Sequence, residues 1–212
     1  MAAARTIGLV VFPDLAALDI VGPYEVLAHL GYEIAWIAET PETVTAHRGL
    51  RIVPDVTFEE APALEVIVVP GGPGYAVQME NESMLAFLRK AAVGARIVSS
   101  VCTGSLILAG AGLLEGKKAT THWMAMDRLG QLGAIPVAER VVADGNVVTA
   151  AGVSAGIDMA LILAANLAGP EAAQTIQLNI EYDPQPPFDA GSPEKAPAAI
   201  VAALKGSLKG PV

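Results

Sequence analysis

Cys102 is the only cysteine among the 212 residues, and its sequence setting is typical of a nucleophile. It follows an apolar run at residues 95–101 that predicts a buried strand, and it precedes Thr103 and an apolar, helix-like run. A strand that turns sharply into a helix presents the turn residue above the sheet, and free N–H groups at the helix start stabilise a thiolate. The alternative is a small buried hydrophobic residue, a frequent role of unpaired cysteine.

Two further polar or glycine-rich features follow strand-like runs and are candidates to meet Cys102. Asp19 comes after the run at residues 7–12, and the segment 71–74 comes after the run at residues 66–70. Ligands of open α/β sheets bind beyond the carboxyl ends of the strands, so we expect these residues to converge. Each also has a structural interpretation: Asp19 as a helix N-cap, and the glycines as an ordinary turn without P-loop or dinucleotide-binding spacing.

Composition bounds the class of protein. The chain is 53% hydrophobic and 17% charged, which predicts one folded domain with an ample core. Its net charge of −9 argues against binding to nucleic acid or to anionic membranes. No spacing of His, Asp, Glu and Cys predicts a metal site, and we expect no cofactor.

The same features predict a cellular location. A single cysteine cannot form an internal disulfide, the N-terminal residues do not resemble a signal peptide, and the apolar stretches are short for a membrane span. We therefore expect a soluble cytoplasmic protein. The mean hydropathy of +0.49 leaves room for a buried oligomer interface.

Apolar runs alternate with helical periodicity along the chain, which predicts an α/β sandwich with a mostly parallel sheet. The expected strands are residues 7–12, 32–38, 66–70 and 95–101, and the expected helices are residues 23–30, 84–93, 104–114, 154–167 and 171–180. The first helix is expected to begin near Pro23, because proline suits a first turn. Antiparallel excursions are expected at residues 44–53 and in a hairpin formed by residues 137–143 and 147–150.

The C-terminal residues are expected to lie outside the folded domain. Residues 1–188 are expected to form a single domain, whose final segment, residues 183–188, is proline-rich and extended. Residues 189–212 are expected to form a linker and a short helix over residues 198–208.

Six segments, met in order along the chain, resemble motifs of the ThiJ/PfpI family. They are residues 18–26, 69–72, 100–105, 121–123, 152–158 and 181–188. The resemblance implies a flavodoxin-like three-layer sandwich, a homodimer, a cysteine on a strained elbow, and Asp19 as its acidic partner. The protease-like branch has a histidine where this chain has Thr103, which disfavours peptidase activity. An aspartate in place of the glutamate of the glyoxalase-like branch favours the branch that hydrates isonitriles.

This resemblance leads to an expected mechanism. Cys102, with its thiol pKa lowered by the helix N-terminus, attacks the terminal carbon of an isonitrile while Asp19 delivers a proton. Hydrolysis of the resulting thioimidate, with Asp19 as base, releases an N-substituted formamide. The N–H groups of Gly72 and Thr103 are expected to stabilise negative charge, and the Thr103 hydroxyl to position water or substrate. Expected substrate-binding side chains are Ile20, His122, Trp123 and Val153.

Other functions share these residues. A glyoxalase or another thiol-dependent hydrolase would use the same cysteine. A redox sensor would have Cys102 oxidised by peroxide. The family resemblance also extends to the sensor-like half of AraC-type regulators, but the negative charge and the short C-terminal segment disfavour a transcriptional regulator.

Overall fold

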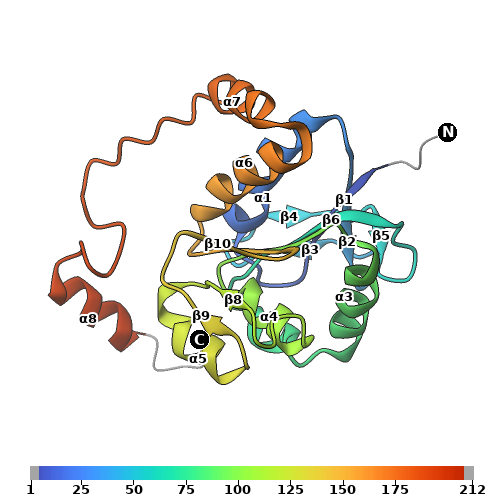
Figure 1. Cartoon of the computed structure of the whole chain (residues 1–212). Coiled ribbons are helices and arrows are strands. Elements are labelled where there is room, and N and C mark those ends of the chain that lie inside the picture. The colour runs from blue at the N-terminus through green and yellow to red at the C-terminus, as the bar shows by residue number, and fades with distance from the viewer. Residues whose placement is uncertain (1–4, 208–212) are drawn as a thin grey trace.

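The computed structural model describes residues 5–207, and within them seven strands form one central sheet (Figure 1). The strand order is β10-β11-β7-β6-β1-β2-β5. Four of the five inner strands are nearly all buried, as their continuous apolar runs predict, because helices cover both faces. These four strands are β1 (Thr6–Val10), β6 (Leu64–Val69), β7 (Ile97–Val101) and β11 (Val147–Ala150).

Strand pairing confirms a mostly parallel sheet with an antiparallel hairpin. β2 (Glu33–Ala38) and β5 (Val56–Thr57) extend the sheet in parallel on one side, whereas β10 (Val141–Asp144) pairs antiparallel with β11 on the other. The expected excursion at residues 44–53 is a second antiparallel pair. It consists of β3 (Val44–Thr45) and β4 (Arg51–Ile52). Periodicity did not predict the third, two-stranded sheet, whose strands β8 (Lys118–Ala119) and β9 (Ile135–Pro136) have two residues each.

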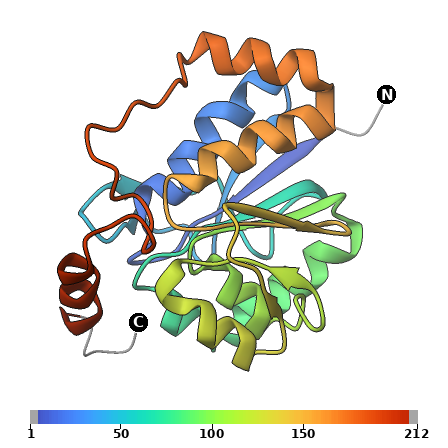
Figure 2. The same cartoon turned by 60° about the vertical axis from the view of Figure 1, so that its left-hand side comes forward.

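Helices lie in two layers on either side of the sheet (Figures 1 and 2). One layer contains α1 (Ala17–Leu27), continued by the 3₁₀ turn η1 (Ala28–Leu30), with α6 (Ala155–Ala168) and α7 (Pro170–Asn179). The other contains α2 (Tyr75–Gln78), α3 (Glu82–Gly94), α4 (Gly104–Gly110), the 3₁₀ turn η2 (Trp123–Ala125) and α5 (Met126–Gln131). This is the expected three-layer, flavodoxin-like sandwich.

The first helix differs from the prediction in one way that matters for the site. It begins at Ala17 rather than near Pro23, so the proline lies inside the helix and removes one backbone hydrogen bond. Close packing against α6 compensates, because a Cβ on Gly156 would lie 3.2 Å from Cγ of Pro23. The earlier start places Asp19 in the first turn of α1.

An extended segment, residues 183–197, follows α7 and is called the arm below. It leads away from the sandwich and returns to it before α8 (Ala198–Ser207) (Figure 1). The predicted short helix is therefore present, although Leu208 lies outside the described residues, as do residues 1–4 at the other end. Among residues 5–207, no helix is both long and apolar enough to cross a membrane.

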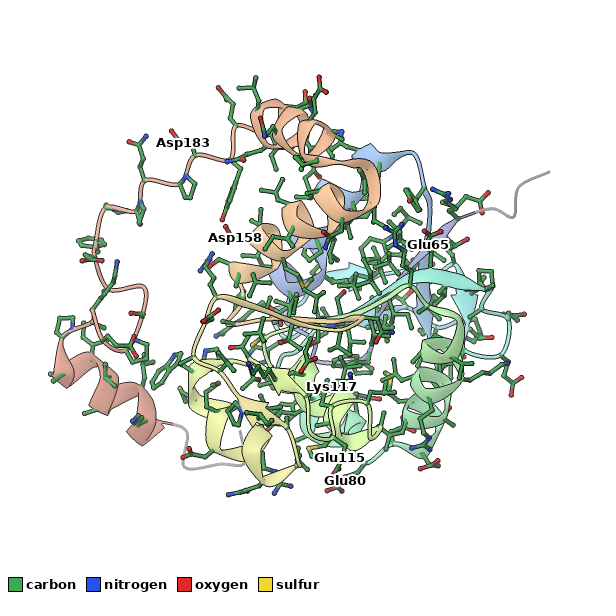
Figure 3. All side chains as sticks on the ribbon, in the orientation of Figure 1. Glu65, Glu80, Glu115, Lys117, Asp158 and Asp183 are labelled. Carbon is green, nitrogen blue, oxygen red and sulfur yellow. The ribbon has the colours of Figure 1, made fainter. Side chains whose placement is uncertain are left out.

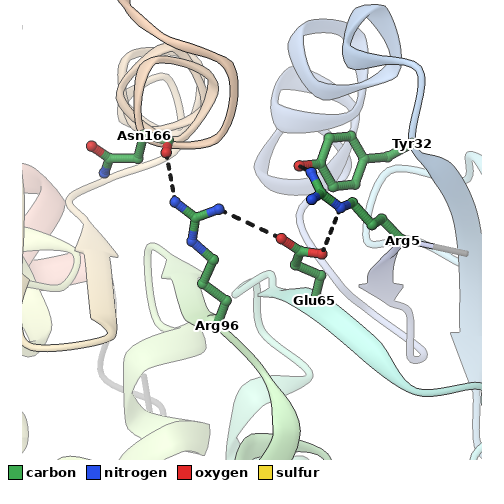
Figure 4. Close-up of polar contacts among 5 residues, drawn as sticks. All are labelled: Arg5, Tyr32, Glu65, Arg96 and Asn166. Atoms are coloured by element: carbon green, nitrogen blue, oxygen red, sulfur yellow. Dashed lines mark hydrogen bonds and ion pairs between the residues drawn. The ribbon is translucent and has the colours of Figure 1, made fainter. Parts of the chain in front are cut away.

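The amino ends of the inner strands are joined by a network of charged and polar side chains around the partly buried Glu65 (Figure 4). Glu65 on β6 lies 3.7 Å from Nε of Arg5 and 3.6 Å from a terminal nitrogen of Arg96, measured to its carboxylate oxygens. Arg96 also donates to the backbone oxygen of Asn166 in α6 (2.8 Å), and Arg5 donates to the hydroxyl of Tyr32 (3.3 Å). These contacts tie neighbouring strands and one helix together at this edge.

Candidate active site

Cys102 lies at a sharp turn between β7 and α4 in a conformation that non-glycine residues rarely adopt. Its φ is +58°, and the strained turn is fixed by hydrogen bonds on both sides of the residue. Its N–H donates to the backbone oxygens of Ala150 (3.1 Å) and Ala151 (3.0 Å), and its carbonyl accepts from the Thr121 hydroxyl (2.9 Å). The strand-to-helix elbow is thus present, and the loop after β11 is attached to it.

Asp19 is fully buried beside this elbow. Its Oδ2 accepts a hydrogen bond from the N–H of Gly71 (2.9 Å), whereas its Oδ1 has no hydrogen-bond partner among the described residues. The N-cap position of α1 is occupied by Ala16, so the capping interpretation of Asp19 is wrong. A buried carboxyl group with one unsatisfied oxygen is costly for folding and is typical of a functional site.

The two side chains perturb each other electrostatically. Burial raises the pKa of Asp19 to about 7, although the Gly71 N–H and the Cys102 side chain act in the opposite direction. Burial, followed by the nearby Asp19 charge, raises the pKa of the Cys102 thiol to about 12. The N–H groups of Val153 and Thr103 and the Thr103 side chain lower that pKa, but by less. The expected low-pKa thiolate is therefore wrong for this state: the resting sulfur holds a proton.

The glycine-rich segment after β6 is shaped by close contact with Thr103. The N–H of Gly72 donates to Oγ1 of Thr103 (3.0 Å), so it is already used and does not point freely at a substrate. A Cβ on Gly71 would lie 2.4 Å from the same oxygen, and a Cβ on Gly104 would lie 2.3 Å from the backbone oxygen of Val69. These glycines are required by the approach of the two loops rather than by phosphate binding.

A cavity of about 610 Å³ lies next to the elbow. Thr121 and Ala151, which hold the backbone of Cys102, also line this cavity. Its volume is in the range of pockets that hold small organic molecules. The lining consists of residues 120–123, 138–140, 151–154 and 191–194, together with Leu18 and Met126. In the described part of the chain, no three His, Cys, Asp or Glu side chains are grouped so that they could hold a metal ion.

The structure separates the candidate substrate-binding residues into two groups. His122, Trp123 and Val153 line the cavity. Ile20 does not line it and is fully buried in the hydrophobic core, because α1 begins early and directs this side chain into the sandwich. The position expected of Ile20 on the apolar wall is instead taken by Leu18, two residues earlier on α1.

His122 packs directly on the loop that follows β11. A Cβ on Gly152 would lie 2.9 Å from its Cδ2, and burial lowers the pKa of the imidazole. The ring is therefore neutral at pH 7. Its Nδ1 accepts a hydrogen bond from the N–H of Met124 (3.4 Å), which assigns the ring proton to Nε2.

Sequence reasoning missed two parts of the cavity wall. Arg140 lines the cavity with its Nε donating to Oδ2 of Asp158 (2.6 Å), and the Tyr182 hydroxyl donates to the same oxygen (3.2 Å). Asp158 lies on α6, where Figure 3 labels it. Residues 191–194 of the arm form the other missed part. Asp158 and Tyr182 both lie within the motifs noted above, which was the available signal for the first part. The arm has no periodic pattern that could have revealed the second.

The chain is similar in sequence and in structure to proteins of one known family. Residues 5–166 match the DJ-1/PfpI family. An isonitrile hydratase of Pseudomonas putida is 53% identical over 201 residues, covering 93% of this chain and 87% of that protein. A glutathione-independent glyoxalase of Caenorhabditis elegans is 25% identical, covering 82% of this chain and 95% of that one. A crystal structure of a ThiJ/PfpI family protein from Pseudomonas syringae, 42% identical, superposes with a TM-score of 0.95 over 97% of this chain and 86% of its own.

Proposed function

Because this chain belongs to the DJ-1/PfpI family, we propose that it acts as an isonitrile hydratase, which converts an isonitrile and water into an N-substituted formamide. The observation that carries the proposal is the buried carboxyl of Asp19 beside the thiol of Cys102 at a strained elbow. The similarity to the isonitrile hydratase of Pseudomonas putida, which extends over nearly the whole chain, supports the substrate class.

The first half of the reaction joins sulfur and hydrogen to the same carbon. Asp19 has a pKa of about 7, so a large fraction is ionised at neutral pH and can accept the thiol proton. As that proton leaves, the sulfur electron pair forms a bond to the terminal carbon of R–N≡C. Asp19 then passes the proton to this carbon, giving the thioimidate R–N=CH–S–Cys102. The N–H groups of Val153 and Thr103 stabilise the negative charge that develops on sulfur.

The second half returns the enzyme to its starting state. Asp19, ionised again, takes a proton from water while the water oxygen bonds to the thioimidate carbon, and the nitrogen receives that proton. The carbon–sulfur bond then breaks, sulfur keeps the electron pair, and the proton of the new hydroxyl group returns to it through Asp19. The product R–NH–CHO leaves with the atoms of one water added. One carboxyl group thus acts as base and acid in both halves.

The cavity is the proposed site of the R group. Trp123, Val153 and Leu18 supply apolar surface, and the N–H at Nε2 of His122 is available as a hydrogen-bond donor to the formamide oxygen. The Thr103 hydroxyl is held beside Gly72, where it can position water. We further propose that the protein works in the cytoplasm, as its composition indicates, and that it forms a homodimer, as the resemblance of its motifs implies.

A direct assay tests the proposal. Purified protein incubated with cyclohexyl isocyanide should form N-cyclohexylformamide, detected by gas chromatography with mass spectrometry. The Cys102→Ala variant should form none, while its circular dichroism spectrum stays that of the unmodified chain. Methylglyoxal serves as the competing substrate: turnover of methylglyoxal without formamide production would assign the same cysteine to glyoxalase chemistry instead.

A further inference from the structure

The arm returns to the sandwich at one place, and that place is the cavity. Residues 183–191 are all exposed, but Ser192 and Pro193 are half-buried where they line the cavity beside residues of three other loops. Figures 1 and 2 both show the chain leaving the sandwich after α7 and curving back toward it before α8. Burial is therefore concentrated at the segment that contributes to the cavity wall.

Contacts on both sides of this segment hold the arm in place. At its start, the Tyr182 hydroxyl donates to Asp158 (3.2 Å), and Nε2 of Gln177 donates to the backbone oxygen of Tyr182 (3.1 Å). Beyond its end, Nζ of Lys205 in α8 lies 5.8 Å from the ring centroid of Trp123, itself a cavity residue. The second anchor therefore acts on the cavity wall directly.

The returning segment also has local structure of its own. The N–H groups of Lys195 and Ala196 both donate to the backbone oxygen of Ser192 (3.1 and 2.9 Å), which closes a turn. Nζ of Lys195 lies 2.9 Å from Oδ1 of Asp189 across the same turn. These contacts fix the conformation of the turn, so the part of the cavity wall that it forms has a defined shape.

We propose that residues 191–194 are a specificity-determining wall of the cavity, which limits the size of the R group that reaches Cys102. This inference rests on the proposed function for the identity of the substrate, but the wall itself rests on the cavity lining and the two anchors. The chemistry is located on the sheet, and the limit on size is supplied by a segment that lies outside the matched family region, residues 5–166.

A bulky side chain on the wall, with a matched control, tests the proposal. Ser192→Trp places an indole where the arm lines the cavity, and Gln185→Trp places the same group on the exposed part of the arm. For Ser192→Trp we expect kcat/KM for cyclohexyl isocyanide to fall by about tenfold or more relative to methyl isocyanide. Gln185→Trp should leave that ratio unchanged. An unchanged ratio in Ser192→Trp overturns the proposal.

A second measurement separates the wall from the reaction. Cys102 is the only thiol, so its alkylation can be followed by intact-mass spectrometry without any turnover. Ser192→Trp should slow alkylation by N-benzyl iodoacetamide more than alkylation by iodoacetamide, whereas Gln185→Trp should slow neither. If no isonitrile is hydrated but this selectivity changes, the proposed function fails and the wall stands. If isonitriles are hydrated but neither ratio changes, the wall fails and the function stands.

Discussion

The amino ends and the carboxyl ends of the parallel strands, called here the amino edge and the carboxyl edge of the sheet, differ in how they treat charge and backbone strain. At the amino edge, Glu65 is paired with two arginines that are exposed to water, and although the β1–β6 register shifts at Glu65, none of the three charged residues has a positive φ. At the carboxyl edge, Asp19 is buried with one oxygen unsatisfied, and Cys102 has a positive φ. Among residues 5–207, two more non-glycine residues with a positive φ lie at this edge. Asp14 follows β1 and Val153 follows β11. Costly features are thus gathered at one edge, which is the expected signature of function rather than of stability.

The largest effect on the reaction rate is expected from replacing Asp19, the proton-transfer group at the carboxyl edge. Asp19→Asn keeps an oxygen that can accept from Gly71 but removes the ability to exchange a proton. We expect the rate of formamide production to fall roughly 10²–10⁴-fold, or about 3–5 kcal/mol in the activation barrier. Steady-state kinetics with cyclohexyl isocyanide would measure this, and a rate within a fewfold of the unmodified protein would reduce Asp19 to a structural residue.

The same variant gives a second test through the pH dependence of stability. The pKa of Asp19 is about 7 in the folded protein, above its ordinary value of 3.8, so the folded state binds the proton more tightly. Its contribution to stability is complete below pH 4 and is lost as the pH rises toward 7, by an amount on the order of a few kcal/mol. Urea denaturation at pH 5 and pH 8 should show a smaller loss of stability in Asp19→Asn. Equal losses in both proteins would contradict the buried, proton-holding carboxyl.

A smaller effect is expected from the loop that packs against Thr103. In Gly71→Ala the new methyl group meets Oγ1 and the backbone nitrogen of Thr103, at 2.4 and 2.5 Å in the present geometry. We expect a loss of about 1–3 kcal/mol in the free energy of unfolding and a lower rate of turnover, because the elbow must shift. Gly94→Ala in α3, where a Cβ meets nothing within 4 Å, is the matched control and should be neutral or slightly stabilising.

The smallest effect is expected at the opposite edge. Glu65→Gln removes the charge shared by Arg5 and Arg96, and exposed ion pairs of this kind contribute about 0.2–1 kcal/mol each. Thermal unfolding should show a slight loss of stability that disappears at high salt, and formamide production should not change. A change in kcat would show that the two edges are energetically coupled.

The sequence predicted the fold because the responsible signals are local and strong. Continuous apolar runs such as residues 66–70 and 95–101 mark inner parallel strands, and the glycine turn between residues 143 and 147 marks the hairpin. Family motifs and topology together placed Asp19 and Cys102 at the same edge of the sheet. The start of α1 was predicted too late, because packing against Gly156 allows Pro23 inside a helix, and such packing is not visible in the sequence.

The electrostatic state of the site could not be predicted for a related reason. A helix N-terminus favours a thiolate, but burial at the elbow and the charge of Asp19 outweigh it, and both depend on loops distant in sequence. The same applies to Ile20 and Leu18, whose exchange of roles follows from where α1 begins. Residues 191–194 became part of the cavity only through the path of the arm, which no local pattern records.

The positive φ at Cys102 has a consequence for protein engineering. Side chains branched at Cβ are strongly disfavoured in this backbone conformation, whereas small or unbranched ones tolerate it better. Saturation mutagenesis of this codon should therefore yield well-expressed serine, asparagine and glycine variants but poorly folded threonine, valine and isoleucine variants. The turn therefore limits which nucleophiles directed evolution can sample at position 102, and its backbone geometry disfavours threonine independently of the reactivity of the hydroxyl group.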